Sequence, residues 1–191
     1  DLCGHATLAA AHVLFKHLDY PNQLINFNTK SGRLVVEETG DGYCMNFPAT
    51  MPVESDFPDN LIEGLAATPV EVLTGFDYVA VFENEAQISA IRPDFEKLSK
   101  LGLRGVVITA PGEDEDFVSR CFYPKLRVNE DPVTGSAHCQ LAPYWAKRLG
   151  KNKFTAKQLS KRTGKLACEV RSERVLLAGR AADYLKGVIT F

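Results

Sequence analysis

The chain has 191 residues, of which 45% are hydrophobic and 24% charged, and its formal net charge is −2. A chain of this size can bury a core, and its balanced charge argues against nucleic acid or a membrane surface as a partner. No apolar run reaches the roughly 18 residues of a membrane span, and no signal peptide is evident. Five widely spaced cysteines without a CxxC pair favour reduced thiols, so we expect a cytoplasmic protein.

The first part of the sequence predicts a helix followed by an antiparallel meander. Apolar residues recur three and four positions apart over 4–19, which predicts an amphipathic helix. Three segments rich in β-branched and apolar residues follow, separated by two turn-forming sequences that contain glycine. These expected strands are 23–29, 33–38 and 43–47. The segment 48–60 holds three prolines and predicts a connection between two domains, 1–60 and 61–191.

The rest of the sequence predicts further strands and a second long helix. Two short helices are expected on either side of Pro93, and a long one over 136–149, stopped by Gly150 and bent by Pro143. The expected strands are 69–73, 78–82, 105–110, 117–123, 156–160, 165–171, 175–177 and 184–191. The last of them, within about 181–191, is expected to return to the first domain.

Two parts of the sequence repeat each other at almost constant spacing. The tetrapeptide GHAT at 4–7 matches GSAH at 135–138, and the segment 29–37 matches 161–169. Gly4 and Gly135 are 131 positions apart, and Gly32 and Gly164 are 132 apart. Matching at two points with one spacing favours duplication over chance. We therefore expect two pseudo-symmetric halves that face each other across a twofold axis.

The helix starts at Gly4 and Gly135 are the candidate binding groups. The first N–H groups of a helix have no partner within it and lie at the positive end of its dipole, so they suit a carboxylate. With His5, Asp131 and Ser136 beside them, proton transfer on a small carboxylated molecule becomes possible. Structural alternatives remain open: His5 could cap or pack, Asp131 could initiate a turn before a proline, and Ser136 could be an N-cap.

Four segments resemble the phenazine-biosynthesis PhzF-like family of the diaminopimelate epimerase superfamily. They are 1–9 (DLCGHATLA), 131–139 (DPVTGSAHC), 120–124 and 141–145. The resemblance implies an α+β fold in which each half has a mainly antiparallel sheet wrapped around a central helix. It also implies isomerase chemistry without metal or organic cofactor, and a possible homodimer. Carried over by position, His5, Asp131 and Ser136 are the catalytic residues, and the segments at Gly4, Ala6, Gly135 and Ala137 bind the substrate carboxylate.

The family's acid/base glutamate lies in a segment upstream of the residues that match this chain. The alternative function is therefore a catalytically impaired PhzF-like scaffold that serves as a protein-interaction module. A racemase with two thiols is a minor alternative, because Cys3 resembles one epimerase cysteine but the partner position is Asp131. No metal site is expected, because His5 and His12 could share a helix face but no third ligand has a recognisable spacing. His12 and His17 are interpreted as surface or half-buried helix residues.

Overall fold

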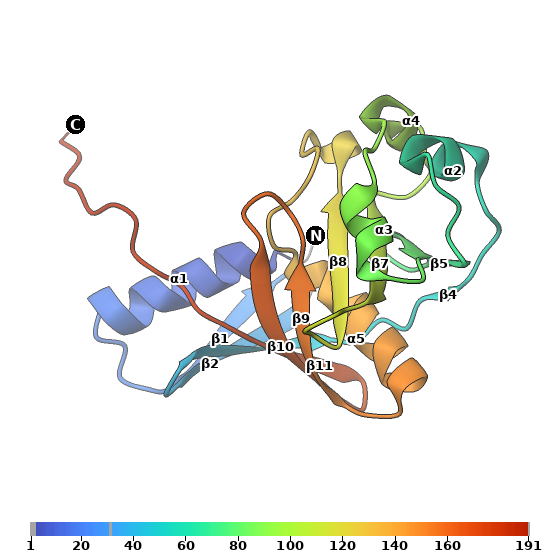
Figure 1. The fold of residues 1–191 in the computed structure, drawn as a ribbon. Coiled ribbons are helices and arrows are strands. Elements are labelled where there is room, and N and C mark those ends of the chain that lie inside the picture. Colours follow the sequence, from blue (N-terminus) through green and yellow to red (C-terminus); the bar gives the residue numbers. More distant parts are fainter. Residues whose placement is uncertain (1–2, 31, 191) are drawn as a thin grey trace.

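The computed structural model describes residues 3–30 and 32–190, and it has a mixed α+β fold around one sheet (Figure 1). The helices are α1 Gly4–His17, α2 Asp59–Leu65, α3 Glu85–Ala90, α4 Phe95–Ser99 and α5 Gly135–Leu149, with a 3₁₀ turn at Pro124–Leu126. The strands are β1 Leu24–Thr29, β2 Gly32–Thr39, β3 Gly42–Pro48, β4 Val53–Glu54, β5 Glu71–Thr74, β6 Tyr78–Val81, β7 Val106–Pro111, β8 Phe117–Phe122, β9 Lys153–Gln158, β10 Gly164–Arg171 and β11 Arg174–Gly179. None of the described helices is long and apolar enough to cross a membrane.

The described strands form one eleven-stranded sheet in the order β1-β2-β3-β11-β10-β9-β8-β7-β6-β5-β4. Two neighbouring pairs, β6 with β7 and β8 with β9, are parallel, and the other pairs are antiparallel. The expectation of one sheet for each half needs correction here. The strands of the two predicted halves belong to one continuous sheet because β3 pairs directly with β11.

The repeated sequence segments correspond to a repeated arrangement of elements. Helix α1 is followed by the meander β1-β2-β3, and helix α5 by the meander β9-β10-β11. Where the two units meet, Met45 of β3 lies opposite Leu177 of β11. These two residues are 132 positions apart, which is the offset of the repeat in the sequence. With this offset, Tyr43 is equivalent to Val175 and Phe47 to Gly179. These equivalent residues pair crosswise, Phe47 with Val175 and Tyr43 with Gly179, so the register between the units is symmetric.

Both faces of the central strands are buried. In β7, Val107 belongs to the core that contains Leu141 and Trp145 of α5, whereas its neighbour Ile108 belongs to the core beneath α2, α3 and α4. Figure 1 shows these three short helices gathered at one side of β7 and β8. Burial on both faces explains why β7 has a nearly continuous apolar sequence rather than an alternating one.

Helix α5 contains a proline whose structural cost is offset by a loop. Pro143 has no N–H, so the carbonyl of Cys139 one turn earlier receives no helical hydrogen bond. The backbone N–H of Thr50, from the segment after β3, donates to that carbonyl at 2.9 Å. Further along the helix, the indole of Trp145 donates to the Thr109 hydroxyl at 3.0 Å and stacks on Phe117. The segment after β3 is thereby attached to α5.

The strand predicted at 184–191 is wrong, and the segment 48–60 contains elements that the sequence did not indicate. The expected connection 48–60 contains β4 and the start of α2, which is held by the fully buried Leu61 and Leu65. The expected strand 184–191 is absent from the described residues 184–190, and Phe191 lies outside the described residues. The segment 184–190 pairs with no described strand, so its backbone lacks ladder partners, and four apolar side chains stay exposed: Tyr184, Leu185, Val188 and Ile189.

Candidate functional site

The N-termini of α1 and α5 meet. A methyl group added to Gly4 would lie 3.5 Å from the Cα atom of Gly135, in van der Waals contact, so the two helix starts approach each other closely. The residues before the helices, Cys3 and Thr134, make no side-chain capping bond. Within the described chain, no acceptor is paired with the first N–H groups of either helix, those of 4–6 and 135–137. The juxtaposition therefore brings two positive helix ends to one place.

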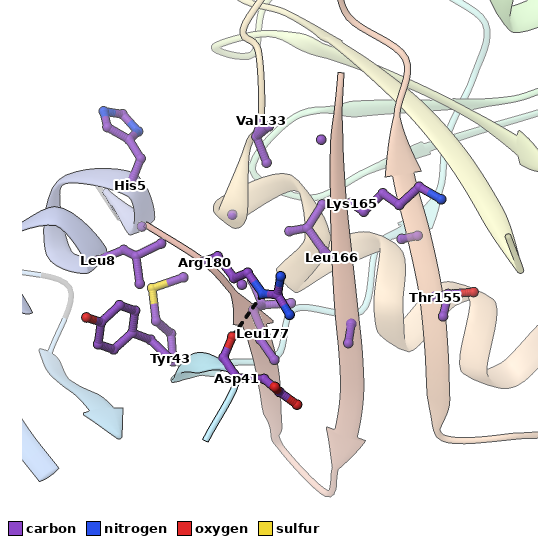
Figure 2. Close-up of a pocket in the computed structure, with 18 of the residues that line it drawn as sticks. His5, Leu8, Asp41, Tyr43, Val133, Thr155, Lys165, Leu166, Leu177 and Arg180 are labelled. Atoms are coloured by element: carbon purple, nitrogen blue, oxygen red, sulfur yellow. Dashed lines mark hydrogen bonds between the residues drawn. The ribbon is translucent and has the colours of Figure 1, made fainter. Parts of the chain in front are cut away.

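A pocket of about 920 Å³ opens beside these helix ends (Figure 2). Gly4 and Gly135 contribute to its wall, and apolar side chains from α1, β3, β10 and β11 form much of the rest. Charged groups are also present: Asp41, Asp114, Glu115, Lys165 and Arg180. The guanidinium of Arg180 is held by the backbone carbonyl of Asp41, which accepts from its Nε at 3.0 Å. The pocket thus combines a largely apolar wall with two helix N-termini whose first N–H groups have no acceptor in the described chain. This arrangement suits a small anionic molecule.

The expected site residues are only partly gathered around this pocket. Gly4, His5 and Gly135 line it, and Figure 2 shows the ring of His5 at its rim. Asp131 and Ser136 are not among its lining residues. His5 is exposed, and its Nε2 lies 3.8 Å from the exposed Cys3 thiol. Ala6 is exposed and Ala137 fully buried, so the latter can offer only its backbone to a ligand.

Asp131 precedes α5 and is held by three polar contacts. Its carboxylate accepts a hydrogen bond from the Thr134 hydroxyl, and its backbone N–H donates to the carbonyl of Cys121 at 2.9 Å. Its own carbonyl accepts from the Gln158 amide at 2.6 Å. These contacts are those of a turn residue, yet the carboxylate is half-buried and has a second oxygen for a proton or a ligand. The turn interpretation and the catalytic interpretation are therefore compatible.

Ser136 is not the N-cap that the alternative interpretation proposed, because Thr134 occupies that position. The Ser136 hydroxyl is buried and accepts a hydrogen bond from Nη2 of Arg104 at 2.9 Å. The same guanidinium binds the Asp77 carboxylate through Nε and Nη2 at 2.7 and 3.0 Å. Since the Ser136 oxygen is the acceptor in this contact, its own proton is available to another acceptor.

The charged network behind Ser136 was missed by sequence reasoning. Asp77 is completely buried and accepts hydrogen bonds from Arg104, from the Gln140 amide at 2.9 Å and from the Tyr123 hydroxyl at 3.3 Å. Burial raises the pKa of Tyr123 well above its ordinary value, so that hydroxyl remains a donor. A single aspartate next to a strand gives no sequence signal, because its partners lie 27 to 63 positions away.

Cys139, which follows the second helix start, is unsuited to form an acid/base pair with Cys3. Cys139 is fully buried, and burial raises the pKa of its thiol to about 12. Its Sγ donates to the carbonyl of Gly135 at 3.4 Å. Such a thiol stays protonated at neutral pH and points into the core, so Cys139 acts as a small apolar residue.

His138 predicts a pH-dependent stability. It is fully buried, its Nδ1 lies 2.8 Å from the Thr134 carbonyl, and burial lowers its pKa to about 4. The unfolded chain takes up a proton near pH 6.5, whereas the folded chain does so only near pH 4. The stability that the neutral His138 ring contributes is therefore complete above pH 6.5. As the pH falls to 4, the free energy of unfolding decreases by roughly 3 kcal/mol.

This contribution can be measured by urea unfolding of the wild type and His138→Phe at pH 7, 5.5 and 4. The variant is expected to lose less stability between pH 7 and 4 than the wild type. His5→Gln, which removes an exposed imidazole, should keep the wild-type pH dependence. Equal losses in the wild type and His138→Phe would refute the assignment to His138.

Residues 1–187 match the family model of the phenazine biosynthesis-like proteins, PhzC-PhzF. The chain belongs to this family. It is 50% identical over 189 residues to a protein of Pseudomonas aeruginosa named an uncharacterised isomerase, covering 99% of this chain and 73% of that protein. A second uncharacterised isomerase from that organism is 48% identical, with 98% and 72% covered.

Solved structures of PhzC-PhzF proteins agree in fold. A putative phenazine biosynthesis PhzC/PhzF protein from Clostridium difficile superposes with a TM-score of 0.92 at 41% identity, over 100% of this chain and 74% of that chain. A phenazine biosynthesis PhzF-family protein from Enterococcus faecalis gives 0.88 at 43% identity, over 93% and 68%. The matched part of each relative is thus about three quarters or less of its length. The sequence expectation of a PhzF-like α+β protein is confirmed.

Proposed function

We propose that the protein is an isomerase that needs no organic cofactor and shifts a proton within a small carboxylated substrate. The observation that carries the proposal is the contact between the starts of α1 and α5, at Gly4 and Gly135, beside an apolar pocket. Two sets of unpaired N–H groups can bind a carboxylate there without a cationic side chain. Family relatives named isomerases support the reaction class. Descent of the two helix-and-meander units from one duplicated unit would account for this pair of helix ends.

The proposed roles follow from position and hydrogen bonding. The backbone at Gly4, Ala6, Gly135 and Ala137 holds the substrate carboxylate. His5, at the pocket rim, and Asp131, with one carboxylate oxygen fixed by Thr134, position or transfer the proton. Ser136, fixed as an acceptor by Arg104, directs its own proton toward the substrate. An additional acid/base residue from the part of the relatives that this chain does not cover is compatible with these roles.

Exchange of substrate hydrogen with solvent tests the reaction class. The complete polypeptide is incubated in D₂O with a panel of small cyclic and amino-acid-like carboxylates, and deuterium uptake is followed by NMR. We expect uptake at a carbon near the carboxylate for at least one compound, and its loss in the double variant His5→Ala, Asp131→Ala. Undiminished exchange in the double variant would refute the proposed roles, and no exchange with any compound would count against the isomerase proposal.

A further inference from the structure

A cluster of potential metal ligands lies outside the candidate site, at the other end of α1. Nε2 of His12 and Nε2 of His17 lie 3.1 and 2.8 Å from the same oxygen of Asp183. The two imidazole rings are nearly perpendicular, with centroids 6.0 Å apart. One ligand atom from each of the three residues lies within 4.8 Å of the others. The three side chains therefore converge on one point.

The spacing of these atoms fits a small divalent ion. Zinc binds imidazole nitrogen and carboxylate oxygen at about 2.0–2.2 Å, so ligand atoms in a tetrahedral site are about 3.3 Å apart. The two separations from the Asp183 oxygen are a few tenths of an ångström shorter, and small side-chain rotations would admit the ion. Two imidazoles with one carboxylate also form a set preferred by zinc-class metals rather than by calcium or magnesium.

The orientation of His12 provides an independent observation. Its second ring nitrogen, Nδ1, lies 2.8 Å from the hydroxyl of Tyr43, a buried residue of β3. A donated Nδ1–H bond would fix the tautomer in which Nε2 carries a lone pair toward His17 and Asp183. Metal-binding histidines commonly have such a partner for the second nitrogen. The side chain of His12 is only 12% exposed, so its ring has little freedom to turn away.

We propose that His12, His17 and Asp183 form a binding site for a zinc-class divalent metal ion, with a fourth position open to water. The ion would attach the segment after β11 to α1. In the described structure this segment is otherwise held near its start, where Arg180 donates to the Asp41 carbonyl and Ala181 packs on the core. The site is separate from the proposed catalytic residues, and its occupancy does not depend on the isomerase reaction.

Sequence spacing concealed this site. His12 and His17 are five positions apart, which separates them by about 140° around an ideal helix, so they do not share a face. His17 is the last residue of α1, and the third ligand is 166 positions further along the chain. Only the folded chain brings the set together.

Calorimetric titration of the tag-free complete polypeptide with zinc sulfate tests the proposal. One Zn²⁺ is expected to bind per chain, and His17→Gln and Asp183→Asn are each expected to weaken binding at least about tenfold. Tyr43→Phe, which removes only the partner of His12, should also weaken it. Two matched controls should bind zinc as the wild type does. His5→Gln removes an exposed imidazole on α1, and Asp19→Asn changes an exposed carboxylate just after this helix.

The alternative location is the pair Cys3 and His5, which cobalt substitution distinguishes. A Co²⁺ ion bound by nitrogen and oxygen gives visible bands without the strong near-ultraviolet charge-transfer band of a thiolate ligand. Zinc affinity unchanged in both His17→Gln and Asp183→Asn would overturn the proposal. So would a thiolate band that disappears in Cys3→Ser. Circular dichroism of each variant confirms that a weakened affinity does not reflect unfolding.

Discussion

Replacing Asp77 by alanine is expected to destabilise the protein by about 3 kcal/mol. The carboxylate is fully buried and holds Arg104, Gln140 and Tyr123. Its removal leaves a mostly buried guanidinium without its counter-charge, which costs more than the loss of a surface ion pair. Urea unfolding at pH 7 measures the change.

A second substitution separates the charge from the packing. If the cost comes from the unpaired guanidinium, Asp77→Ala combined with Arg104→Met should be less destabilised than the sum of the two single variants. In an exposed ion pair, Nζ of Lys97 lies 2.9 Å from a carboxylate oxygen of Glu63. Glu63→Ala removes this pair and should change stability far less than Asp77→Ala does. An equal effect of Asp77→Ala and Glu63→Ala would contradict the account.

Asp131→Asn is expected to lower the rate of proton exchange into substrate by roughly 100- to 10,000-fold, the range for loss of a positioned acid/base group. Asparagine is nearly the same size and can still accept from the Thr134 hydroxyl, so the turn before α5 should persist. The rate is measured by deuterium uptake from D₂O into the substrate identified with the wild type. The unfolding free energy of the same variant should change much less than its activity.

Two variants show whether the loss reflects chemistry. Thr134→Val removes the hydroxyl that holds Asp131 but keeps the carboxylate, and should have a smaller effect on the rate. Asp56→Asn changes an exposed carboxylate outside the pocket and should have none. Wild-type activity in Asp131→Asn would exclude this carboxylate from the reaction and leave it a turn residue.

Elements with strong local signals could be predicted from the sequence. The helix at Gly4–His17 follows from its apolar spacing, and Gly150 ends α5 in a left-handed conformation, as its position suggested. The repeat predicted the matching helix-and-meander units, since duplicated sequences carry the same turn and strand signals. The sequence also predicts the helix starts at Gly4 and Gly135, which lie close together in the structure.

Features that depend on distant residues could not be predicted in this way. The joining of both meanders into one sheet requires the pairing of β3 with β11, about 130 positions apart in the sequence. Asp77 gains its importance from Tyr123 just after β8, Gln140 on α5 and Arg104 before β7. For residues 184–190, β propensity suggested a strand, but a strand exists only where a neighbouring edge accepts its hydrogen bonds.

The symmetric pairing of β3 with β11 has a mechanical consequence for the pocket. Six residue pairs, from Tyr43 with Gly179 to Pro48 with Arg174, join the two repeated units through a hydrogen-bonded ladder. Opening a hinge between the units would break this ladder, so the spacing between the starts of α1 and α5 is held fixed by the sheet. Ligand entry and release should therefore depend on side chains and loops around the pocket mouth, while the groups that receive a carboxylate stay preorganised before it arrives.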